Sequence, residues 1–124
     1  MASKKILVVD DEQNILDLVE MILKVEGYRV SKARDGPECF DVVEEVSPDL
    51  VLLDVNMPGM NGWGVYEKLK ENPRTKDIPI AMFTVRAHPG EIERALNAVG
   101  VEDYITKPFD PDELVRRVAR LLSE

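Results

Sequence analysis

The sequence predicts an α/β domain in which helices cover both faces of a five-stranded parallel sheet. Short apolar runs alternate five times with amphipathic helical patterns along the 124 residues. Strict alternation of strands and helices is typical of parallel sheets covered on both sides. The length fits one domain over residues 1–124, which can bury a core without disulfides or structural metal.

The first two strand–helix units have clear sequence boundaries. Residues 5–9 (KILVV) are a short apolar run rich in β-branched residues, which predicts a strand buried on both faces. Apolar residues at helical spacing predict a helix over about 12–27, with a glycine at its end. A second strand is predicted at 28–33 and a second helix over about 35–48, where a proline stops it.

The remaining three units follow the same order. Strands are predicted at 50–53, 78–83 and 102–106, and helices at about 63–70, 92–99 and 110–122. The last helix is the best marked of these. Asp110 can cap it, Pro111 suits its first position, and Glu113 can complete a capping box.

Composition and charge exclude several classes of function. The formal charge of −8 disfavours direct contact with nucleic acid or an anionic membrane, and no apolar run approaches the ~18 residues of a membrane span. The single cysteine, Cys39, excludes a disulfide framework and favours a reducing, cytoplasmic setting. The chain passes from MASKK directly into a strand pattern, so we expect no signal peptide.

Polar residues stand where the predicted strands end. Asp10 and Asp11 follow the first strand, Asp54 follows the third, Thr84 follows the fourth, and Lys107 follows the fifth. Because the carboxyl ends of parallel strands meet at one edge of a sheet, we expect these side chains to converge there. Taken singly, each has a plain structural explanation, as a helix cap, a turn residue or a solvated lysine. Taken together, they indicate a binding site.

Three carboxylates in one place need compensating positive charge. Two unit charges ~4 Å apart repel by about 4 kcal/mol at an effective dielectric constant of ~20, so stability alone would not assemble them. Carboxylate oxygens suit Mg²⁺, with Mn²⁺ as the alternative ion. The loop after the first strand reads DDEQN and has neither a dinucleotide-binding nor a P-loop pattern. A metal, a lysine and a hydroxyl would instead hold a transferring phosphoryl group, with Asp54 as its nucleophile.

Four motifs carry a resemblance to a known family. They are LVVDDE at 7–12, LLDVNMPGMNG at 52–62, MFT at 82–84 and YITKPF at 104–109. In this order and spacing the chain resembles the receiver domain of two-component response regulators, in particular the single-domain receivers of chemotaxis and phosphorelays. The resemblance implies a flavodoxin-like fold with strand order 2-1-3-4-5.

The resemblance also implies a reaction and its residues. Asp54 would accept phosphate from a sensor histidine kinase or a histidine phosphotransfer protein. Asp10, Asp11, Asp54 and the backbone carbonyl of Asn56 would hold Mg²⁺, and Lys107 would pair with the phosphoryl oxygens.

The same resemblance implies a conformational switch. Thr84 would turn toward the new phosphate and Tyr104 would move inward with it. These movements would remodel the face formed by the fourth helix, fifth strand and fifth helix, where a downstream protein target would bind. The Lys107–Pro108 peptide is expected to be cis.

Two residues depart from the commonest family pattern. Val85 stands where a small residue is usual, and we hypothesise that it slows hydrolysis of the acyl phosphate. Asn61 replaces a common aspartate and should matter little, because a turn accepts either residue. Phe109 fits either the core or the output surface.

Two other functions compete with this interpretation. Phosphatases of the haloacid dehalogenase type also use an aspartate nucleophile and Mg²⁺, but they need a second aspartate where this chain has Asn56. A receiver-like module that binds partners without phosphorylation is disfavoured by the intact set of acids, threonine and lysine. We therefore expect a signalling phosphoacceptor that catalyses only its own phosphorylation and slow dephosphorylation.

Overall fold

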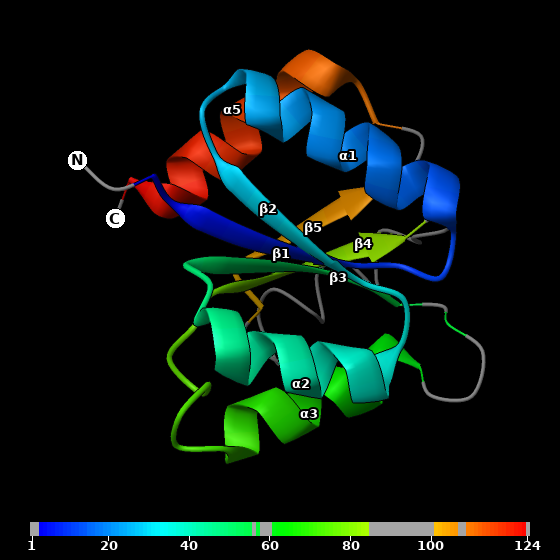
Figure 1. Ribbon diagram of the computed structural model, residues 1–124, viewed down its shortest axis with the longest axis vertical. Helices are drawn as coiled ribbons and strands as arrows, with labels where there is room; N and C mark the ends of the chain where they lie inside the picture. The colour runs from blue at the N-terminus through cyan, green and yellow to red at the C-terminus, as the bar shows by residue number, and fades with distance from the viewer. Residues whose placement is uncertain (1–2, 56, 58–60, 85–100, 107–108, 124) are drawn as a thin grey trace.

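Five parallel strands form one sheet in the order β2-β1-β3-β4-β5 (Figure 1). The computed structural model describes residues 3–55, 57, 61–84, 101–106 and 109–123. The strands are β1 (Lys5–Val9), β2 (Arg29–Ala33), β3 (Leu50–Asp54), β4 (Ile80–Thr84) and β5 (Asp103–Thr106). The helices are α1 (Gln13–Val25), α2 (Gly36–Val46), α3 (Gly62–Glu71) and α5 (Pro111–Leu122). The predicted flavodoxin-like fold and strand order are confirmed; the helix predicted at 92–99 lies outside the described residues.

The sheet separates two apolar cores. Helices α1 and α5 cover one face, and α2 and α3 cover the other (Figure 1). Successive strand residues point to opposite faces. In β1, Ile6 and Val8 therefore pack with the α1 and α5 side, while Leu7 and Val9 pack with the α2 and α3 side. All four side chains are fully buried, as expected of a strand covered on both faces.

Helix α1 ends in a Schellman motif, which explains one shifted boundary. Gly27 has φ 94°, a left-handed conformation that suits glycine. Its N–H donates to the carbonyl of Lys24 (3.0 Å), and the N–H of Tyr28 donates to that of Leu23 (3.2 Å). Tyr28 thus completes the helix end, and β2 begins at residue 29 rather than 28 as predicted.

The N-caps of α2 and α5 are the predicted residues, but the predicted capping box of α5 is not completed. Asp35 caps α2 by accepting a hydrogen bond from the Glu38 N–H, as the predicted helix start requires. Asp110 caps α5 by accepting from the Asp112 N–H. The carboxylate of Glu113 lies 3.5 Å from the side chain of Arg117, so an ion pair one turn along replaces the second bond of the predicted capping box.

Strand β4 begins two residues later than predicted. The N–H of Ile78 donates to the carbonyl of Thr75 in a turn (3.1 Å), which keeps Ile78 out of the strand. Pro79 has no N–H, and its carbonyl accepts from Val51 (3.0 Å) at the start of the β3 pairing.

Among the described helices, none has the length and apolar character that crossing a bilayer requires.

Candidate functional site

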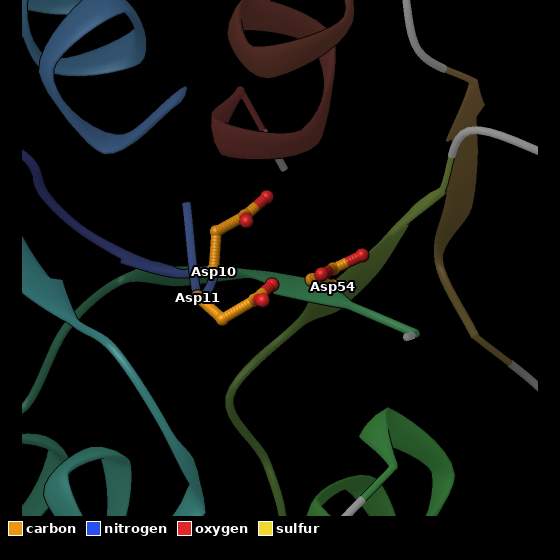
Figure 2. Close-up of side chains that lie close together, drawn as sticks. All are labelled: Asp10, Asp11 and Asp54. Carbon is orange, nitrogen blue, oxygen red and sulfur yellow. The ribbon is translucent and has the colours of Figure 1, made fainter. Parts of the chain in front are cut away.

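Three carboxylates meet at the carboxyl edge of the sheet. Asp10 and Asp11 follow the last residue of β1, and Asp54 is the last residue of β3. Each offers a carboxylate oxygen, and these oxygens all lie within 4.8 Å of one another. Figure 2 shows the three side chains gathered at the ends of the two central strands. The predicted convergence is confirmed for these residues.

Burial and hydrogen bonds hold this cluster in place. Asp10 is fully buried and Asp54 is 3% exposed, while Asp11 is partly exposed. The N–H of Asp10 donates to the carbonyl of Ala33 (3.1 Å), which ties the end of β1 to β2. One carboxylate oxygen of Asp10 accepts from the N–H of Glu12 (2.9 Å), which fixes the turn into α1. The backbone therefore positions Asp10 before any ligand binds.

Helix capping does not account for Asp11. The N-cap of α1 is Glu12, whose side chain makes no capping bond, and the helix begins at Gln13. The plain structural explanation that Asp11 caps the first helix is therefore wrong. Its carboxylate lies instead beside those of Asp10 and Asp54.

The donor set fits a hard divalent cation. Mg²⁺ binds oxygen ligands at about 2.1 Å, so two ligands on opposite sides of the ion lie about 4 Å apart. Asp10, Asp11 and Asp54 present carboxylate oxygens at a comparable spacing. Such an ion would also offset the repulsion among three carboxylates. These residues are therefore suited to hold Mg²⁺.

The other predicted site residues stand at the same edge or outside the described chain. Thr84 is the last residue of β4 and pairs with Thr106 of β5. Lys107, which directly follows β5, and Asn56, two residues after Asp54, both lie outside the described residues. Val85 and the Lys107–Pro108 peptide also lie outside them. The roles given to these residues stay predictions.

Tyr104 is buried in this structure. Its side chain is 6% exposed and belongs to the core on the α2 and α3 side of the sheet. The predicted inward movement with phosphorylation remains a prediction.

Gly62 supports the site and was not recognised from the sequence. Its N–H donates to the carbonyl of Val55 (2.7 Å). A Cβ atom here would overlap the carbonyl oxygen of Asp54 and lie 2.8 Å from the Cα of Val55. Only glycine lets α3 begin this close to the backbone beside Asp54.

Asn61 has a more specific role than the turn residue predicted. It is the N-cap of α3, and its side-chain oxygen accepts from the N–H of Gly64 (3.0 Å). Asparagine and aspartate are about equally good N-caps, which agrees with the expectation that this departure matters little.

A partly buried ion pair attaches α5 to β5 and was also not predicted. Asp103 is 8% exposed, and one of its carboxylate oxygens accepts from Arg117 Nη1 (2.7 Å) and from the N–H of Tyr104 (2.8 Å). Burial alone would lower the pKa of Arg117, but its hydrogen bond to Asp103 and the charge of that group outweigh burial and raise the pKa. The pair fixes one helix of the predicted output face.

Phe109 and Cys39 both lie in or against the two apolar cores. Phe109 stacks on Phe83 with ring centroids 5.2 Å apart, so it packs against the core on the α1 and α5 side. Cys39 is fully buried, and burial raises the pKa of its thiol to about 12. A thiol in that state is not a nucleophile near neutral pH.

Comparisons with known proteins agree with this geometry. A family model described as the response regulator receiver domain matches residues 6–119. The chain is 33% identical to the chemotaxis protein CheY4 of Vibrio cholerae, with a TM-score of 0.89 over 98% of this chain and 100% of that one. A putative response regulator from Chloroflexus aurantiacus is 32% identical, with a TM-score of 0.89 over 99% and 100%.

The same fold also occurs inside a longer protein. The chain is 31% identical to NtrX from Brucella abortus, with a TM-score of 0.88, and it covers 28% of that chain while matching over 98% of its own length. The similarity therefore extends to proteins of quite different total length.

Proposed function

This chain belongs to the response regulator receiver domain family of two-component signalling, and we propose that it is a signalling phosphoacceptor whose Asp54 takes a phosphoryl group in a Mg²⁺-dependent reaction. The observation that carries the proposal is the acid cluster. Asp10, Asp11 and Asp54 place carboxylate oxygens within 4.8 Å of one another at the edge where ligands bind to such sheets.

The reaction is a displacement at phosphorus. A carboxylate oxygen of Asp54 forms a bond to phosphorus while the bond from phosphorus to the donor's imidazole nitrogen breaks. The leaving nitrogen keeps the bonding electron pair, and Asp54 becomes an acyl phosphate. Because Asp54 ends a buried strand and the backbone beside it packs against Gly62, its carboxylate is held in one position for attack.

The residues around Asp54 would offset the negative charge of the incoming phosphoryl group. Asp10 and Asp11 would hold Mg²⁺ together with Asp54 and the carbonyl of Asn56. The bound ion would draw the phosphoryl oxygens toward the carboxylate and offset their negative charge. Lys107 would pair with the same oxygens from the end of β5.

We propose the downstream signalling step from the resemblance to other receiver domains. Thr84 and Tyr104 would couple phosphorylation to the face formed by the fourth helix, β5 and α5, and a downstream protein target would bind there. The donor would be a sensor histidine kinase or a histidine phosphotransfer protein. We place these events in the cytoplasm, with no direct contact to nucleic acid or membrane.

A multiple-turnover phosphatase is the competing function. Enzymes of the haloacid dehalogenase type need a second aspartate two residues after the nucleophile, and this chain has Asn56 there. With asparagine in place of the general acid at position 56, we expect one phosphoryl transfer per protein followed by slow hydrolysis. Steady turnover of a phosphate ester in Mg²⁺ would support the enzyme instead.

The proposal is tested by phosphorylation with a small donor. Acetyl phosphate and Mg²⁺ should add the mass of a single phosphoryl group, as measured by intact-protein mass spectrometry, and omission of Mg²⁺ should prevent the addition. Asp54→Asn should abolish it, while Asp41→Asn, an exposed acid on α2 with the same change of charge, should leave it intact. Full labelling of the Asp54→Asn variant would refute the proposal.

A further inference from the structure

Arg34 stands beside the acid cluster because of the sheet register. Strands β1 and β2 pair in parallel, and their last register pair is Val9 with Ala33. The hydrogen bond from Asp10 N–H to the Ala33 carbonyl (3.1 Å) continues this pairing past the strand ends. Neighbouring strands lie about 4.8 Å apart, so the backbone of Arg34 follows β2 alongside the backbone of Asp10.

A hollow at this edge joins Arg34 to the site. It has a volume of about 450 Å³ and is lined by Asp11, Arg34, Asp35 and Glu38. Asp11 belongs both to this hollow and to the acid cluster. Among the described residues that line the hollow, Arg34 is the one with positive charge.

The two other acids in the hollow are engaged with the backbone. Glu38 accepts a hydrogen bond from the N–H of Arg34 (2.7 Å), and Asp35 accepts from the N–H of Glu38 (2.9 Å). These bonds fix the turn between β2 and α2. The exposed guanidinium of Arg34 forms no ion pair with any acid in the described part of the chain, so its charge is available to a ligand.

The negative charge at the carboxyl edge of the sheet indicates a role for the positive charge of Arg34. A phosphoryl donor is an anion, and it must approach three clustered carboxylates on a chain with formal charge −8. Guanidinium groups match phosphoryl oxygens in geometry and charge. We propose that Arg34 is a donor-binding residue, whose guanidinium contacts the oxyanions of a phosphoryl donor that reaches Asp54 through the hollow. This inference rests on the proposed function.

The proposal predicts two effects of opposite sign. The charge that attracts the anionic donor also repels Mg²⁺ from the adjacent acids. Arg34→Gln should therefore slow phosphorylation by acetyl phosphate about two- to fivefold at about 0.1 M salt, and the loss should shrink at about 1 M salt, where the screening length falls to about 3 Å. The same variant should bind Mg²⁺ about two- to fivefold more tightly, as expected of a unit charge about 5–10 Å from a divalent ion. If Arg34 only stabilised the fold, Arg34→Gln would lower both the phosphorylation rate and the affinity for Mg²⁺.

The experiment compares three variants with the unsubstituted chain. Arg34→Gln removes the charge, Arg34→Lys keeps it, and Arg29→Gln is the matched control. Arg29 is exposed at the opposite end of β2, about 16 Å away along the strand and beyond the ~10 Å screening length at 0.1 M salt. Rates are followed by intact-protein mass spectrometry, and Mg²⁺ affinity by the fluorescence of Trp63, which adjoins the site through Gly62.

The outcomes separate this inference from the function on which it rests. Slower phosphorylation with tighter Mg²⁺ binding in Arg34→Gln, recovered in Arg34→Lys and absent in Arg29→Gln, supports the role of Arg34. Normal labelling of the unsubstituted chain with equal rates in Arg34→Gln overturns that role alone, and so do equal losses in Arg34→Gln and Arg29→Gln. If the unsubstituted chain takes no phosphate, the proposed function fails, and a donor-binding role fails with it.

Discussion

Replacing Asp11 with asparagine should stabilise the metal-free protein and weaken its response to Mg²⁺. Asp11 contributes a charge to the acid cluster, and it is the partly exposed member of the three. It neither caps α1 nor fixes the turn, since the N-cap is Glu12 and the turn bond is made by Asp10. The substitution therefore removes repulsion while keeping the shape of the side chain.

The separations in the cluster set the size of the effect. Two unit charges 4.8 Å apart, the upper limit found here, repel by about 0.9 kcal/mol in bulk water and about 3.5 kcal/mol at an effective dielectric constant of ~20. Asp11 takes part in two such pairs. Its partial exposure places the interaction near the aqueous limit. We therefore expect the free energy of unfolding to rise by about 1–2 kcal/mol, which corresponds to a Tm increase of about 3–8 °C for a chain of this length.

Magnesium should reverse the order of the two proteins. At a hundred times its Kd, a bound ion adds about 2.7 kcal/mol to the stability of the folded state, which exceeds the gain of about 1–2 kcal/mol expected from the substitution. Asp11→Asn removes a charged ligand and should gain less at the same Mg²⁺ concentration. Thermal unfolding followed by circular dichroism, first in EDTA and then along a Mg²⁺ titration, measures both effects.

A matched control separates local repulsion from total charge. Asp41→Asn changes the formal charge by the same amount on the exposed side of α2 and should shift Tm by about 1 °C or less. A lower Tm for Asp11→Asn in EDTA would refute the reasoning. An equal gain for both variants would do so as well.

Three further perturbations follow from contacts already described. Gly62→Ala should lower the free energy of unfolding by about 1–3 kcal/mol in urea titration and slow phosphorylation, because its Cβ would overlap backbone. Arg117→Met should cost about 1–2 kcal/mol, because it removes the 2.7 Å ion pair of the buried Asp103 carboxylate and leaves that group Arg120 at 3.8 Å and the N–H of Tyr104. The double variant with Asp103→Leu should lose less, and a larger loss in the double variant would contradict this reasoning. The hydrogen bond from Lys32 lowers the pKa of Glu20 from its ordinary 4.5, so the pair stabilises the fold above that pH and the contribution is lost as pH falls through the lowered value. Lys32→Met should therefore cost about 0.3–1 kcal/mol at neutral pH and progressively less as the pH falls below 4.5; a difference that does not shrink in acid would argue against it.

The parts of the site that follow from topology were predictable from the sequence. Asp54 is far along the chain from the adjacent Asp10 and Asp11, yet both sites follow an apolar run that predicts a strand. The parallel arrangement then brings the ends of those strands to one edge without any knowledge of distances. The fold class was predictable for the same reason, since the pattern of apolar residues decides both strand number and helix faces. The strand order was predicted from the resemblance to receiver domains.

Features that depend on the separation of particular atoms were not predictable. The need for glycine at 62 arises because α3 begins against the backbone beside Asp54, and no local pattern encodes that approach. Asp103 lies in the predicted fifth strand and its partner Arg117 in the last helix, and only the packing of α5 against β5 brings their side chains together. Arg34 follows a strand as an isolated cation, and only the register of β1 with β2 places it beside the acids.

The double-sided sheet has a consequence for how this chain can vary. Neighbouring strand residues such as Leu52 and Leu53 belong to different cores, so each core is encoded by every second letter of the same segments. Substitutions in the two cores contact different side chains, and those more than about 10 Å apart should combine additively. A hybrid protein could therefore take the strand positions and helices of one core from one relative and those of the other core from a second relative. Each core would keep its own packing, and the two parents would need to share only the acid cluster.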